Sequence, residues 1–324
     1  MRGRRIGVSA VAAAVMAVLV TAAGAARAAP GPLGDPTRPV KVVVLGGSVS
    51  AYGQGGYAQW IPAVCAKVDL VNRAKEKLNA WELRERFKHE VMKDASLGLK
   101  ARVRDGAEVW LVFLGGLNSV ASPDGTNLDV AKTFKAARDA GLKTMGLTIN
   151  PWGSEKDRRW QGPEGIAYRD YTQRTVDFVM GRLTPAQAFG KAAGGRTAYE
   201  AGELPDIAID IWDSALRHRD APLRERAKIA RLAGRSKWVQ ARLATVPEAE
   251  REAALEALVT AAVALPRYFM RPDFVAFDPI HPNAEGHREI ARLMCAKAPA
   301  SWDCDCRRFE RFAWDHRRGK LKTL

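Results

Sequence analysis

Short apolar runs alternate with longer amphipathic segments along most of the chain. Five of these runs are bounded by glycine or polar residues and predict buried strands, at residues 41–45, 68–71, 109–114, 144–149 and 207–211. Helices are expected between them, at residues 57–66, 78–93, 127–140 and 166–183. Such an alternation of strand and helix predicts a parallel sheet covered by helices on both faces.

Two of the predicted helices have recognisable internal or terminal signals. Leu83, Phe87 and Val91 recur at four-residue spacing in the segment 78–93, which predicts one apolar helix face. In the segment 127–140, Asn127 is expected to be the N-cap, and Gly141 suits the position just after the helix.

Residues 221–265 interrupt the alternation. They are rich in Ala, Arg, Glu and Leu and predict consecutive helices, inserted into a main domain formed by residues 29–220 and 266–300. Two interpretations of this insertion remain open: a lid or substrate wall, and a helical elaboration that packs away from the site. Residues 301–324 form a basic, cysteine-containing tail, whose aromatic residues are expected to pack on the domain while its end frays.

The first 28 residues have the features of an export signal. Arg2, Arg4 and Arg5 precede an apolar stretch, and the small residues around Ala26 and Ala28 form an A-x-A cleavage site. A retained membrane anchor is the alternative. Cleavage is favoured by the small residues and by the proline-rich segment that follows, so the mature chain is predicted to be secreted or periplasmic, without a transmembrane segment.

Export makes the four cysteines candidates for disulfides. Cys304 and Cys306 are too close in sequence to bridge each other without strain, so each is expected to pair with Cys65 or Cys295. A metal site is the alternative, but no histidine lies at ligand spacing from them.

The chain is strongly basic, with 51 Lys and Arg against 36 Asp and Glu. About 47 basic residues remain without the export signal, a net charge near +11. Such a charge favours an anionic envelope surface as a partner of the basic face and tail, although it is equally compatible with a solvated surface. Nucleic acid is not expected, because the chain is exported and contains no recognised nucleic-acid-binding module.

The turn after the first strand contains Gly46, Gly47 and Ser48. A phosphate-binding loop is excluded because no Lys-Ser/Thr pair follows in register, and a dinucleotide fingerprint at residues 53–58 begins too far beyond the strand. A nucleophilic serine is the third interpretation, and it requires a base elsewhere in the chain. Asp278 and His281, in D-P-I-H-P-N, have the spacing at which a carboxylate orients an imidazole.

Gly115, Gly116 and Asn118 follow the third strand, where an amide side chain could donate to a developing oxyanion. Taken in order, the serine, glycine-asparagine and D-x-x-H-P-N blocks resemble the GDSL-type esterases and acyl hydrolases, the SGNH superfamily. The resemblance implies a three-layer α/β/α sandwich of flavodoxin-like type. It also implies catalysis by Ser48, His281 and Asp278, with no metal or organic cofactor.

The resemblance further implies an oxyanion hole made by the Ser48 N–H, the Ala74 N–H and the Asn118 side chain. The chain departs from the family pattern at three positions: Gly47 and Ser119 replace aspartates, and Ala74 replaces a glycine. A backbone N–H remains at Ala74, but alanine tolerates positive φ poorly.

These features predict an exported serine ester hydrolase that acts on a carboxylic ester. The expected substrate is a small-molecule or polysaccharide ester, such as O-acyl groups of cell-envelope polysaccharide. Two alternatives remain: an esterase for lipid or lysophospholipid esters, and a non-catalytic envelope-binding protein that retains the fold.

Overall fold

The computed structural model describes residues 40–324, which belong to one compact unit. The predicted export signal at residues 1–28 lies outside the described residues. Within residues 40–324, no helix combines the length and the apolar character that crossing a bilayer requires.

A five-stranded parallel sheet forms the centre of this unit, with the strand order β2-β1-β3-β4-β5. The strands are β1 (Val40–Gly46), β2 (Val68–Asn72), β3 (Val109–Leu114), β4 (Lys143–Leu147) and β5 (Ile207–Ile209). All five predicted strands are present, and the last two end earlier than expected. They end early because the Thr148 hydroxyl accepts hydrogen bonds from the N–H groups of Ile211 and Trp212, which takes the place of further pairing between the strands.

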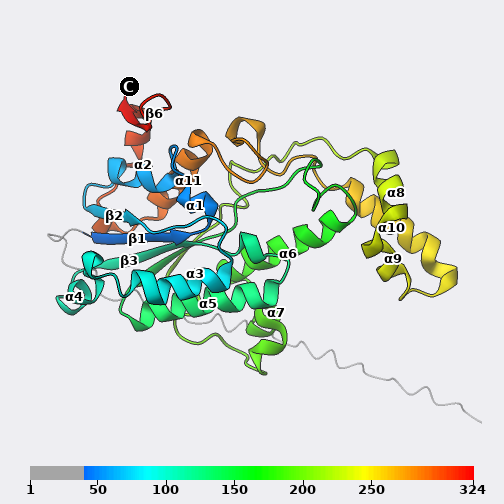
Figure 1. Cartoon of the computed structure of the whole chain (residues 1–324), viewed down its shortest axis with the longest axis horizontal. Helices are drawn as coiled ribbons and strands as arrows, with labels where there is room; N and C mark the ends of the chain where they lie inside the picture. Colours follow the sequence, from blue (N-terminus) through cyan, green and yellow to red (C-terminus); the bar gives the residue numbers. More distant parts are fainter. Residues whose placement is uncertain (1–39) are drawn as a thin grey trace, which may run out of the picture. The chain divides into compact units, whose positions relative to one another are not determined.

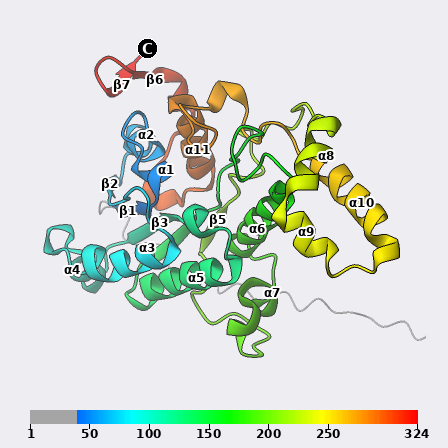
Figure 2. The ribbon, with the colours of Figure 1, turned by 45° about the vertical axis from the view of Figure 1, so that its right-hand side comes forward.

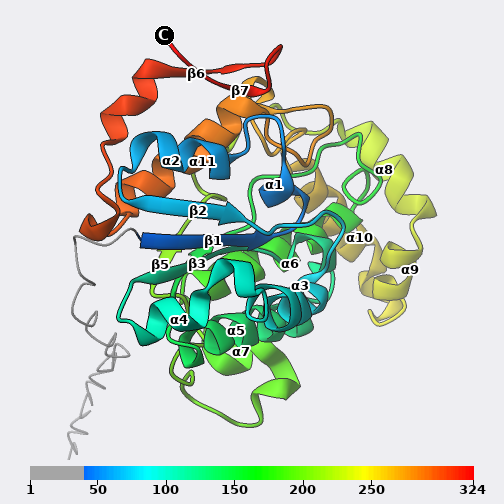
Figure 3. The same ribbon diagram turned by 60° about the vertical axis from the view of Figure 1, so that its left-hand side comes forward.

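Successive residues of β1 face opposite sides of the sheet, as the period of two in a strand requires. Val42 and Val44 pack on the face covered by α2 (Tyr57–Val64) and α11 (Ala284–Lys297). Val43 and Leu45 pack on the other face, against α3 (Ala80–Arg86) and α5 (Pro123–Asp139). Figure 3 shows these two helical layers on either side of the sheet, which confirms the α/β/α sandwich.

All four predicted helices are present, but their boundaries differ from the prediction. Helix α5 begins at Pro123 after Ser122, four residues before Asn127, because the fixed φ of proline suits the first helical turn. Asn127 is therefore not an N-cap: it is buried within the helix, and its amide donates to the carbonyl of Ala188. Gly141 has φ +80°, as expected for the residue after a helix.

The predicted helix 78–93 is shorter and in two parts, because α3 continues into a π-helical turn (Phe87–Val91). The helix expected at residues 166–183 is α6 (Glu164–Val179). Two short helices complete this side of the sheet, α4 (Leu99–Arg104) and α7 (Pro185–Phe189).

The segment 221–265 contains three consecutive helices, as predicted. These are α8 (Arg226–Arg235), α9 (Lys237–Leu243) and α10 (Arg251–Val263), which lie together beyond α6 in Figures 1 and 2. Their apolar side chains share a core with α6 and with three fully buried tryptophans, Trp152, Trp160 and Trp212. These helices are therefore held by a core of their own, separate from the two cores that flank the sheet.

The tail packs on the domain and does not fray at its end. Phe309 and Trp314 are buried in the core between the sheet, α2 and α11. The last residues pair as an antiparallel hairpin of β6 (Phe312–Asp315) and β7 (Lys320–Thr323), and the N–H of Leu324 donates to the carbonyl of Arg311. Hydrogen bonding between these strands orders the segment that the sequence predicted to be frayed.

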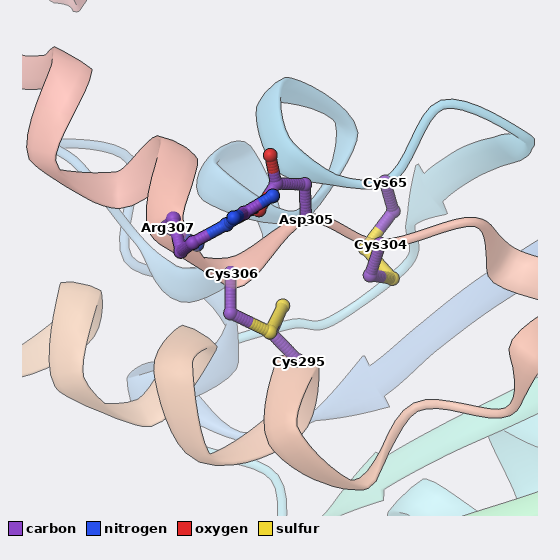
Figure 4. The surroundings of a disulfide bond; sticks show 6 residues. All are labelled: Cys65, Cys295, Cys304, Asp305, Cys306 and Arg307. Atoms are coloured by element: carbon purple, nitrogen blue, oxygen red, sulfur yellow. Dashed lines mark hydrogen bonds and ion pairs between the residues drawn. A yellow bond between two sulfur atoms is a disulfide. The ribbon is translucent and has the colours of Figure 1, made fainter.

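Two disulfides attach the tail, Cys65–Cys304 and Cys295–Cys306 (Figure 4). The expected pairing of Cys304 and Cys306 with the two distant cysteines is confirmed.

Candidate active site

Ser48 lies at the carboxyl end of β1, where the strand changes abruptly into a short helix, α1 (Ser48–Ala51). The turn requires glycine at position 46, because a Cβ there would lie 2.3 Å from the carbonyl oxygen of Leu114. Between β1 and β3 the strand order reverses, and ligands of open parallel sheets bind at such a switch point. Ser48 is half-buried there, and its N–H, the first of the helix, has no intrahelical partner.

Ser50 is the other serine of this turn and is in a different environment. Its side chain is buried, and its hydroxyl accepts a hydrogen bond of 2.8 Å from the hydroxyl of Tyr57. Ser48 is therefore the serine that a substrate can reach.

Asp278 and His281 form a hydrogen-bonded pair in the loop before α11. The Nδ1 atom of His281 lies 2.9 Å from each carboxylate oxygen of Asp278. The Oδ1 atom of Asp278 also accepts from the backbone N–H groups of Ile280 and His281, which fixes the carboxylate. Because an ionised carboxylate can only accept, Nδ1 carries the proton and Nε2 is left as the basic nitrogen.

This loop is fastened to the same edge of the sheet as Ser48. The Asn150 amide, beyond β4, donates to the carbonyl of Ile280, and the Gly153 N–H donates to the carbonyl of Pro279. Tyr52, at the end of α1, is close enough to Asp278 for the two groups to interact electrostatically. Burial raises the pKa of Tyr52, and the negative charge of Asp278 raises it further.

No hydrogen bond between Ser48 and His281 is found among the described residues, a common situation in ligand-free active sites. Phe277 stacks on the imidazole of His281 with a centroid distance of 5.1 Å, and its own side chain is 77% exposed. One face of the candidate base is thus shielded by an exposed aromatic ring.

Asn118 lies beside the serine turn. It belongs to a short 3-10 turn (Leu117–Ser119) that begins after Gly116, whose φ of +103° suits glycine. Its Nδ2 donates to the carbonyl of Leu78 at 2.9 Å, and a Cβ on Gly47 would lie 3.7 Å from that nitrogen. An amide nitrogen has two hydrogens, so Asn118 can hold Leu78 and still donate to a ligand at Ser48.

Ala74 is in the loop after β2. This loop runs alongside the end of β1 as far as the serine turn. Its neighbours Arg73 and Lys75 donate to the carbonyls of Val44 and Gly46, and Ala74 has no positive φ. Its own N–H donates to Oδ1 of Asn72 at 3.0 Å. A role for Ala74 as an oxyanion donor remains a prediction, and it requires the substrate oxygen to replace or share that contact.

Asn72 and Ser119 have positioning contacts that the sequence did not predict. The Asn72 amide donates to the carbonyl of Ser50 at 2.7 Å, which joins the end of β2 to the serine helix. The Ser119 hydroxyl accepts from the N–H of Ala80, which joins the asparagine turn to the start of α3. The sequence feature that could have predicted both contacts is the position of each residue at or just beyond the carboxyl end of a strand.

A small cavity of about 10 Å³ lies beside Ser48. Its lining includes the side chains of Leu78, Leu83 and Leu114 together with the asparagine turn. A volume of this size has room for about one water-sized group. Trp152 and Trp160 are fully buried, and no residue of the segment 221–265 lines this cavity.

No family model matches the chain, and no curated protein matches it in sequence. Among solved structures, it is similar to a GDSL-like lipase from Bacteroides thetaiotaomicron, with 15% identity, a TM-score of 0.43, and coverage of 78% of this chain and 85% of the other. It is also similar to the acetyl xylan esterase AlAXEase, with 12% identity, a TM-score of 0.43, and coverage of 80% and 100%.

A third similar structure is a catalytic variant of an acetylxylan esterase from Geobacillus stearothermophilus, with 13% identity, a TM-score of 0.41, and coverage of 81% and 95%. The fold of the described chain is the α/β/α sandwich expected of an SGNH hydrolase. Its activity is argued below from the site itself.

Proposed function

We propose that the protein is a serine ester hydrolase of the SGNH type. The observation that carries this proposal is the Asp278–His281 pair, in which two backbone N–H groups fix the carboxylate. The pair lies at the edge of the sheet where β1 is followed by Ser48. A merely structural loop histidine does not require a carboxylate partner that is itself fixed by two backbone N–H groups.

The chemistry follows from the roles of these groups. Asp278 orients His281, whose Nε2 takes the proton of Ser48 as the serine oxygen attacks the ester carbonyl. The negative oxygen is stabilised by the Ser48 N–H and the Asn118 amide, with the Ala74 N–H as a third donor. His281 then gives its proton to the departing alkoxide, and water releases the acyl group from Ser48 by the same steps.

The cavity beside Ser48 supports a short acyl group. Leucines line part of this cavity of about 10 Å³, which has room for a group the size of a methyl. We therefore propose acetyl or similarly short esters as substrates, with O-acyl groups of polysaccharide as the class. For long-chain lipid esters, the first alternative, the leucines that line this cavity would have to move apart.

Export is part of the same proposal. All four cysteines form two disulfides, and disulfides persist mainly in oxidising compartments outside the cytoplasm. A secreted or periplasmic location, with the leader at residues 1–28 removed, accounts for them.

The test combines covalent labelling with a series of esters of increasing acyl length. A serine-reactive fluorophosphonate should label the protein at Ser48, as located by peptide mass spectrometry. Turnover of 4-nitrophenyl esters should be highest for acetate and fall steeply by butyrate. Rising turnover up to octanoate would favour a lipid esterase, and absence of both labelling and turnover would favour a non-catalytic binding protein.

A further inference from the structure

Trp81 differs from the other tryptophans in its exposure. All nine lie within residues 40–324, and Trp81 alone is among the exposed large apolar side chains, at 54%. It is the second residue of α3, so the rigid first turn of a capped helix holds its backbone: Asn79 and Glu82 form a reciprocal capping box there. A large apolar ring fixed in solvent in this way is a frequent feature of a binding surface.

Trp81 lines an open groove of about 250 Å³ between α3 and the loop before it. The groove begins beside the candidate active site, because Leu78 lines both the groove and the small cavity at Ser48. The carbonyl of Leu78 also accepts the hydrogen bond from Asn118. One residue thus separates the two spaces, and a ligand in the groove would lie next to an ester at Ser48.

The charges of the groove favour a neutral ligand. Its lining contains two basic residues, Lys75 and Arg86, one histidine, and three glutamates, at positions 82, 85 and 90. Arg86 pairs with Glu90, and the Arg84 guanidinium, by hydrogen bonding, holds the pKa of Glu85 below its usual range. This groove therefore does not share the positive excess of the whole chain, and its paired charges offer both donors and acceptors to hydroxyl groups.

We propose that the groove binds a pyranose ring of a neutral oligosaccharide, stacked on Trp81, as the alcohol part of the ester. The face of an indole is electron-rich, and the C–H groups on one side of a pyranose carry the complementary positive charge. The sugar hydroxyls then meet the charged rim, and an O-acyl group on a neighbouring sugar reaches Ser48 past Leu78. This inference rests on the proposed hydrolase function for its biological meaning, but the binding itself does not require turnover.

The test measures binding and turnover separately. Calorimetric titration of the Ser48→Ala protein with the neutral pentasaccharides xylopentaose, cellopentaose and chitopentaose reports binding without hydrolysis. At least one should bind, and adding Trp81→Ala should weaken that binding by about tenfold or more. Trp81→Phe should restore most of it, and Leu223→Ala, which removes an exposed apolar side chain elsewhere, should leave it unchanged.

The kinetic test uses the protein with Ser48 intact. Trp81→Ala should raise KM for an O-acetylated form of the bound pentasaccharide while leaving kcat/KM for 4-nitrophenyl acetate within twofold. Failure of every pentasaccharide to bind, or equal binding with and without Trp81, would overturn the groove proposal. Binding without turnover of any ester would instead contradict the hydrolase and leave the sugar site intact.

Discussion

At the scale of single residues, the two serines of the first turn differ in their environment, and Ser48 is the candidate nucleophile. Ser48 is half-buried beside a small cavity, whereas the Ser50 hydroxyl is buried and accepts from Tyr57. Two residues of sequence separation thus place chemically identical groups in different environments, because the tight helical turn directs them to different sides.

We therefore expect opposite effects from substituting the two serines. Ser48→Ala should lower turnover of 4-nitrophenyl acetate by on the order of a million-fold, with the melting temperature nearly unchanged. Ser50→Ala should keep most of the turnover and lower the free energy of unfolding by about 1–3 kcal/mol, because it leaves the buried Tyr57 hydroxyl unpaired. Steady-state kinetics and urea unfolding of both variants provide the comparison, and a reversed ranking of turnover would exclude Ser48 as nucleophile.

Asn118 should act mainly on the transition state. The ester carbonyl is a modest acceptor in the ground state, and its oxygen is nearly fully charged in the tetrahedral intermediate. Asn118→Ala should therefore lower kcat by about a hundred- to thousand-fold and change KM by less than about threefold.

The Asn118 amide also holds the carbonyl of Leu78, so a loss of structure must be measured as well. Turnover is to be expressed per folded molecule, alongside the melting temperature. A destabilised Asn118→Ala variant with unchanged kcat would show that the residue only supports the loop.

At the scale of elements, α11 packs an unusual residue against the serine helix. His287 is fully buried, stacks on Tyr52 at 4.7 Å, and neither of its ring nitrogens has a hydrogen-bond partner among the described residues. Burial, together with the smaller effect of the nearby His281, lowers the pKa of His287 to about 3. The contact between α1 and α11 therefore depends on a histidine that stays neutral.

This neutral histidine makes stability depend on pH. The unfolded chain protonates His287 below about pH 6.5, whereas the folded chain does so only near pH 3, so unfolding is favoured as the pH falls between these values. His287→Phe should remove this contribution. The difference in the free energy of unfolding between the variant and the original protein should therefore be about 2 kcal/mol more favourable to the variant at pH 5 than at pH 8.

Urea unfolding at the two pH values measures this difference. His316→Phe, the same change at an exposed position, should show no such pH dependence. An equal effect of His287→Phe at pH 5 and pH 8 would mean that His287 is protonated in the folded protein.

At the scale of the whole molecule, one of the two disulfides joins the beginning and the end of the described chain. Cys65–Cys304 spans 239 residues and ties the end of α2 to the tail, whereas Cys295–Cys306 spans 11 residues. Because a cross-link stabilises mainly by restricting the unfolded chain, the longer span should contribute more.

We expect no free thiol in denatured, non-reduced protein produced in an oxidising compartment. Replacing Cys65 and Cys304 by alanine should cost about 5 kcal/mol, and replacing Cys295 and Cys306 about 3 kcal/mol. Thiol titration and chemical unfolding of the two double variants test both statements. Four free thiols in periplasmically expressed protein, or the reverse order of stability loss, would contradict them.

Much of this organisation was determined by the sequence itself. The five strands were predictable because buried parallel strands are nearly continuous apolar runs, and Val109–Leu114 has the bounds expected for it. The serine turn, the asparagine turn and the Asp278–His281 spacing were predictable because each is a local pattern with its own chemistry. The pairing of Cys304 and Cys306 with distant partners followed from the reach of a side chain.

Tertiary structure decided what depends on residues far apart in the chain. The Asn127 side chain was misassigned because its amide donates to the carbonyl of Ala188, a partner 61 residues away, whereas the start of α5 at Pro123 is a local signal. Four other features could not be predicted from the sequence. They are the burial of His287, the ordered end of the tail, the position of Leu78 between the cavity and the groove, and the exposure of Trp81. Each feature depends on tertiary contacts between segments that are distant in the sequence. Local periodicity and propensity contain no information about such contacts.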